Sequence, residues 1–87
     1  MPLAVNRVFP SPFTNLIGVT FTDLVTSEVV LNLYDDIGRL VATQSSVPNG
    51  VYQELKVDNL AKGIYFLMVK IGDGKPETTK LFGAGKN

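Results

Sequence analysis

Apolar residues recur at every second position along most of this chain, which is the pattern of a β-strand with one buried face. In the segment 63–71, for example, Tyr65, Leu67 and Val69 fall on one parity. Three other segments, at 17–21, 29–33 and 51–57, show the same alternation, and turn-forming pairs such as Asn49-Gly50 separate the apolar runs. We therefore predict no helix and seven strands, over residues 5–9, 15–22, 28–34, 39–45, 51–58, 63–71 and 77–82.

Many short strands with regular turn signals are typical of a β-sandwich. The chain has 87 residues, which suits a single domain. The segment 63–71 is apolar on both parities for most of its length, so we expect a central strand that is covered on both sides. The predicted fold class is all-β: an immunoglobulin-like antiparallel β-sandwich of about seven strands.

The composition excludes most catalytic sites. The sequence contains no Cys and no His. The absence of Cys excludes disulfides and thiol chemistry, and the absence of His removes the commonest general base and zinc ligand. Ser-His-Asp, Cys-His and His-Glu-x-x-His sites are therefore impossible. We predict that the chain is not an enzyme and that it has no catalytic residue, cofactor or metal.

The charge pattern bears on possible partners. Eight basic and eight acidic residues are interspersed and give a net charge of zero. Nucleic acid requires a concentrated positive face, so it is not an expected partner. No apolar run approaches the roughly 18 residues that mark a membrane-spanning helix, so we predict no transmembrane segment. The first seven residues lack the long apolar region of a signal peptide.

The most specific local pattern combines Leu60, Gly63 and Tyr65. This spacing resembles the tyrosine corner of Greek-key sandwiches, in which the tyrosine hydroxyl bonds back to nearby backbone. In that interpretation the leucine fills the core and the glycine permits the bend. The predicted role of this pattern is structural.

Two ligand hypotheses stand beside the structural interpretation. Asp35, Asp36 and Asp58 are possible oxygen ligands for calcium, although turn-forming Asx chemistry explains the same residues without a metal. Tyr34 and Tyr52 are candidates for exposed rings that stack on a carbohydrate. Most other aromatic residues fall on the parity expected for the core.

Four motifs occur in order between Val8 and Leu81, nearly the whole chain. They are Phe-Pro-Ser-Pro-Phe at 9–13, Leu-Tyr-Asp-Asp-Ile-Gly-Arg at 33–39, Leu-Ala-Lys-Gly-Ile-Tyr at 60–65 and Thr-Lys-Leu at 79–81. In this order and spacing they resemble the type A C-terminal sorting domain of the type IX (Por) secretion system. The chain departs from that family in two places. It has Pro-Ser-Pro where Pro-Asn-Pro is common, and Gly83-Ala84-Gly85 precedes Lys86.

The resemblance implies a signal that directs an attached cargo protein through the outer membrane. The implied location is the periplasm in transit, and then the cell surface or the medium of a member of the Bacteroidota. The implied partners are the type IX translocon with its shuttle protein, a sortase-like peptidase that removes the domain and anchors the cargo, and an upstream cargo domain. The family motif positions expected to be recognised by the translocon are Asp35, Gly38, Arg39, Lys62, Gly63 and Lys80.

The resemblance also suggests how the chain is divided. Residues 1–7 are expected to be a linker remnant from the cargo, residues 8–82 the sorting domain, and residues 83–87 a flexible tail. The alternative function is a fibronectin-like accessory or carbohydrate-binding module of a secreted enzyme.

Overall fold

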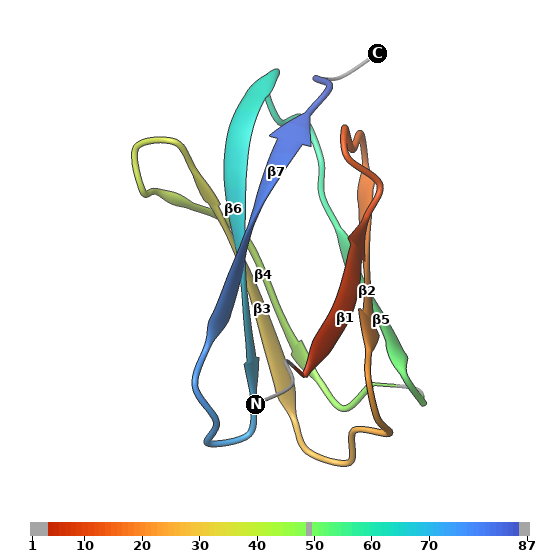
Figure 1. Ribbon diagram of the computed structural model, residues 1–87. Helices are drawn as coiled ribbons and strands as arrows, with labels where there is room; N and C mark the ends of the chain where they lie inside the picture. Colours follow the sequence, from red (N-terminus) through yellow and green to blue (C-terminus); the bar gives the residue numbers. More distant parts are fainter. Residues whose placement is uncertain (1–3, 49, 86–87) are drawn as a thin grey trace.

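A computed structural model describes residues 4–48 and 50–85, which form a sandwich of two antiparallel sheets (Figure 1). Three strands form one sheet in the order β1-β2-β5, and four form the other in the order β4-β3-β6-β7. The described residues contain no helix, and hence none that could cross a membrane. The strands are β1 (Val5–Phe9), β2 (Leu16–Phe21), β3 (Val29–Asp35), β4 (Leu40–Ser46), β5 (Tyr52–Lys56), β6 (Gly63–Ile71) and β7 (Glu77–Gly83).

The predicted fold class, an all-β antiparallel sandwich of seven strands, is confirmed. Every predicted strand is present, and no boundary differs by more than two residues. The two-residue period explains this agreement, because it sends alternate side chains of each strand into one core between the sheets. The buried apolar residues are Phe13, Ile17, Val19, Phe21, Val29, Leu31, Leu33, Leu55, Val57, Tyr65, Leu67, Val69 and Leu81.

The strand β6 is central, as predicted, because it lies between β3 and β7. The expectation that it is covered on both sides is wrong for the described residues. Its outward-facing residues Ile64, Phe66 and Met68 are half-buried or exposed, and they lie outside the core cluster. An apolar run of both parities therefore marks a strand with one face in the core and an apolar face turned outward.

Glycine closes the turn between β3 and β4, where Gly38 has a φ of 86°. This left-handed conformation is one that residues with a side chain rarely adopt. In the turn between β6 and β7 the left-handed residue is Gly72, with a φ of 53°. Asn49 of the predicted Asn-Gly hairpin lies outside the described residues.

Both ends of the chain enter the sandwich further than the predicted division implies. Residues 5–7, assigned to a linker, belong to β1, and the amides of Ala4 and Val5 donate to the Glu77 carboxylate at 3.2 and 3.3 Å. At the other end β7 continues to Gly83. The Ala84 amide donates to the Phe13 carbonyl at 2.8 Å, so the first two residues of the predicted tail are bonded to the fold. Lys86 lies outside the described residues.

The two ends of the sandwich carry different parts of the sequence (Figure 1). Val5 lies at one end, where its amide meets the first residue of β7. The opposite end gathers residues 10–15, 36–39, 57–62 and 83–85, as the pairing of Asp35 with Tyr65 and of Phe13 with Gly83 requires. We call this opposite end the motif end, because three of the four sequence motifs meet there.

Candidate functional site

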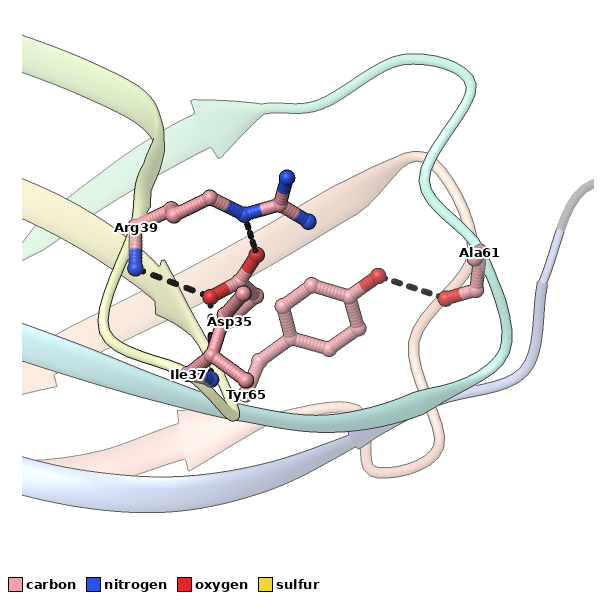
Figure 2. A network of polar contacts seen from close by, with 5 residues as sticks. All are labelled: Asp35, Ile37, Arg39, Ala61 and Tyr65. Carbon is pink, nitrogen blue, oxygen red and sulfur yellow. Dashed lines mark hydrogen bonds and ion pairs between the residues drawn. The ribbon is translucent and has the colours of Figure 1, made fainter.

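Asp35 organises the turn between β3 and β4 at the motif end (Figure 2). Its Oδ1 accepts hydrogen bonds from the amides of Ile37 and Arg39 at 3.1 and 2.8 Å. Its Oδ2 lies 2.7 Å from Nε of Arg39. One carboxylate therefore fixes both the backbone of the turn and the direction of the Arg39 side chain.

The Asp35–Arg39 pair leaves most of the guanidinium available. The Arg39 side chain is 74% exposed, whereas the Asp35 side chain is 10% exposed. A guanidinium has five N–H donors, and Asp35 engages only the one on Nε. Within residues 4–48 and 50–85 no other group bonds to the terminal nitrogens. The turn thus presents a positioned pair of amino groups to solvent.

Hydrogen bonding lowers the pKa of Asp35 below its ordinary value of 3.8. The bond from the Arg39 amide is the largest cause. Burial, the second largest, raises the pKa, but the bonds from the Arg39 side chain and the Ile37 amide lower it further, so the net shift is downward. Because the folded state holds this carboxyl at a lower pKa than the unfolded state, its contribution to stability is complete above the unfolded value. It is lost as the pH falls through the folded value.

An Asp35→Asn variant is therefore expected to show a shallower loss of stability on acidification than the parent chain. The amide cannot ionise, so its part of the acid dependence disappears. The measurement is the thermal midpoint of both proteins from neutral pH down to about pH 2. Parallel curves would contradict the proposed linkage.

Tyr65 ties the start of β6 to the loop before it (Figure 2). Its hydroxyl donates to the carbonyl of Ala61, four residues earlier, at 2.6 Å, which is the geometry of a tyrosine corner. Burial raises the pKa of Tyr65, so the hydroxyl remains a donor. The ring packs against that of Phe13 in a T-shaped arrangement, with a centroid distance of 5.4 Å. Leu60 packs against the core, as the pattern predicts.

A Tyr65→Phe variant is expected to lower the free energy of unfolding by about 1 kcal/mol, because the Ala61 carbonyl loses its partner. Urea denaturation measures the difference. Tyr34→Phe is the matched control, since the Tyr34 hydroxyl makes only a long contact of 3.5 Å with Asn32. Equal losses in the two variants would show that the corner bond is not specific.

The structure divides the six predicted recognition residues between two surfaces. Five lie at the motif end, in the β3–β4 turn or beside the start of β6. Lys80 instead lies on the outer face of the four-stranded sheet, opposite Phe66. Gly38 and Gly63, with φ values of 86° and 155°, have backbone conformations that already favour glycine. Arg39 and Lys62 are the exposed cations among the five.

The ligand hypotheses find less support. The described residues hold no group of three or more His, Cys, Asp or Glu side chains placed to bind a metal ion, and the Asp35 carboxylate is engaged by its own turn. Tyr34 lies in β3 and Tyr52 in β5, on different sheets. These two rings therefore do not form one platform for a carbohydrate.

Two residues at the motif end have roles that the sequence analysis missed. Phe13 is 1% exposed, packs against the Tyr65 ring and pairs with Gly83. A Cβ on Gly83 would stand 2.7 Å from Cε2 of Tyr65. The buried position of Phe13 could have been inferred from the sequence, because an apolar residue directly follows Pro12. The close approach of Gly83 to the rings could not, because residues 13, 65 and 83 meet only through the strand order.

Comparison with protein families matches residues 7–82 to the secretion system C-terminal sorting domain. This range includes the Asp35–Arg39 turn, the tyrosine corner and nearly all of the seven strands. No curated protein and no solved structure gives a significant match. The chain therefore belongs to the family of secretion system C-terminal sorting domains, the sorting signals of type IX (Por) secretion.

Proposed function

We propose that the motif end of this sorting domain is the surface that the outer-membrane type IX translocon and its shuttle protein recognise. Family membership makes the chain a sorting signal for type IX secretion, so the protein that carries it crosses the cell envelope and is secreted or displayed at the cell surface. The proposal adds which surface of the domain the translocon and its shuttle protein contact.

The observation that carries the proposal is the Arg39 guanidinium, which Asp35 orients while its terminal nitrogens stay exposed. The Arg39 side chain is mostly exposed, and an ion pair with so exposed a partner contributes little to stability, so folding alone does not account for a fixed arginine here. A guanidinium fork binds carboxylates through two parallel hydrogen bonds. Arg39 is thus suited to contact an acidic group of the translocon or shuttle protein, with Lys62 as a second cation at the same end.

The position of the start of the chain is consistent with recognition of the motif end. The body measures 34 × 22 × 21 Å, and the start of β1 and the motif end lie at opposite ends of it (Figure 1). A cargo domain joined upstream approaches at the Val5 end. The motif end then stays accessible while the cargo is attached.

Other parts of the proposal follow from the family. The domain acts as an address label and not as a catalyst, and its sequence has no His or Cys. After passage through the periplasm and the outer membrane of a member of the Bacteroidota, a sortase-like peptidase removes the domain and anchors the cargo. The match over residues 7–82 does not support the alternative of an accessory or carbohydrate-binding module.

A fluorescent passenger with a signal peptide, fused before Met1, tests the proposal in a host with an intact type IX system. The parent fusion is expected outside the cell or on its surface. Arg39→Ala is expected to reduce export by about tenfold, the effect of losing one charge-assisted contact. Its thermal midpoint is expected to change only slightly, because the backbone amides of residues 37 and 39 still bond to Asp35.

Lys75→Ala is the matched control, because Lys75 is an exposed cation in the turn between β6 and β7, at the opposite end of the sandwich. It is expected to be exported like the parent. Export of Arg39→Ala at the parent level would refute the assignment of the motif end. A parent fusion that stays in the periplasm would refute transport by this domain altogether.

A further inference from the structure

The outer face of the four-stranded sheet carries a continuous apolar patch. The register places Tyr34 opposite both Leu40 and Phe66, and Ile64 opposite Phe82. The exposed fractions of Ile64, Phe82 and Leu40 are 37%, 41% and 53%. Adjacent rows add further apolar side chains. We call this surface the outer patch; its members are Val30, Tyr34, Leu40, Ile64, Phe66, Met68 and Phe82.

The only charged strand residues on this face are two lysines. Lys80 lies opposite Phe66, and Lys70 lies opposite Val30. Both are exposed, and neither has an ion pair within the described part of the chain. No strand position on this face is acidic, so the charged strand residues beside the outer patch are all positive.

The outer face of the three-stranded sheet differs both in its apolar side chains and in its charges. There the rings of Phe9 and Tyr52 pack at a centroid distance of 6.2 Å over the buried Gly18. The Tyr52 hydroxyl donates to Glu54 at 2.8 Å, and Lys56 two residues later carries the opposite charge. An apolar outer face whose strand charges are all of one sign is thus a property of the four-stranded sheet and not of the three-stranded sheet.

We infer that the outer patch is a second docking surface, for a protein of the secretion machinery that offers an apolar surface with carboxylates opposite Lys70 and Lys80. The inference rests on the proposed function, to which it adds a contact separate from the Arg39 end. Contiguous exposed apolar surface marks interaction sites, and complementary charge selects the partner and its orientation.

The charges on this face disfavour a second copy of the domain and an anionic membrane as its binding partner. Pairing two copies of the outer patch would bring lysines together without any acidic partner, and like charges across an interface are unfavourable. Anionic membranes are recognised by clusters of roughly 4–8 basic residues, whereas the described strand positions of this face carry two cations, Lys70 and Lys80. A protein partner with carboxylates is the occupant that fits.

The passenger assay tests the inference with the double variant Lys80→Glu/Phe82→Ser. It reverses one charge and removes one exposed ring from the outer patch, leaving the core residues in place. Export is expected to fall by at least about tenfold, the effect of losing a central interface residue, with a thermal midpoint close to the parent.

The matched control is Lys56→Glu/Leu24→Ser. It makes the same kinds of change at exposed positions outside the patch, since Leu24 is 68% exposed and Lys56 lies in β5. This control is expected to be exported normally. Export of the patch variant at the parent level overturns the inference, and Arg39→Ala in the same assay reports separately on the proposed function.

Two measurements on the purified domain distinguish a protein partner from a second copy of the domain and from a lipid surface. Analytical ultracentrifugation is expected to show a monomer, and flotation with phosphatidylglycerol–phosphatidylcholine vesicles is expected to show no binding. A dimer that Phe82→Ser dissociates would assign the patch to a second copy. Vesicle binding that Lys80→Glu abolishes would assign it to lipid. Either result would overturn the proposed protein partner.

Discussion

A Gly83→Val variant is expected to lose about 2–3 kcal/mol of unfolding free energy, as overpacking of a well-packed site does. A Cβ at this position would lie 2.7 Å from Cε2 of Tyr65 and 3.3 Å from Cζ of Phe13. The Tyr65 ring has little freedom to move away, because its hydroxyl bonds to Ala61 and the ring packs against Phe13. Urea denaturation followed by circular dichroism measures the loss.

Ala84→Val is the matched control, since Ala84 is the neighbour of Gly83 and is exposed. It is expected to unfold at nearly the parent urea concentration. Gly83→Ala should fall between the two variants, because alanine adds the clashing Cβ without the branches of valine. A Gly83→Val midpoint equal to that of the parent would show that the two rings adjust without cost.

Deletion of residues 77–87 is expected to abolish both folding and export. It removes β7, which pairs with β6 from Gly63↔Gly83 to Val69↔Glu77, and with it the buried Leu81. Losing such a leucine alone costs about 2–5 kcal/mol, and a domain of this size has only about 4–13 kcal/mol in total. The deletion also leaves β6 as an unprotected edge strand that is prone to aggregation.

The test of the deletion is the loss of a cooperative thermal transition, together with retention of the fluorescent passenger inside the cell. Lys80→Gln is the informative companion, because it keeps the pairing of β7 and removes only one charge. It is expected to fold like the parent and to be exported less efficiently. Export of the deletion variant at the parent level would show that the sorting signal does not require the complete sandwich.

The two classes of variant separate shape from surface chemistry. Gly83→Val and the deletion act on the folded body, whereas Arg39→Ala and Lys80→Gln act on exposed groups. If export follows only stability, the translocon accepts any folded form of this domain. If export falls while stability is retained, specific side chains carry the signal.

The sequence by itself determined the fold class, the seven strands and the tyrosine corner. These features depend on relations within a few residues. The two-residue period assigns each side chain to a face, and the spacing from Ala61 to Tyr65 permits the hydrogen bond between them. Asp35 was likewise recognisable as a turn residue, since its carboxylate bonds to the backbone two and four residues later.

Only the tertiary structure decided which residues from distant segments meet. The apolar outer face of β6 was predicted to be covered, because periodicity reports that both parities are apolar and not what packs against them. Lys80 was grouped with Arg39, yet the strand order places it on the outer face of the sheet. Gly83 was assigned to a tail, although it lies against Tyr65 and Phe13. Each of these outcomes depends on pairings between strands that are far apart in the chain, and no local pattern of residues encodes them.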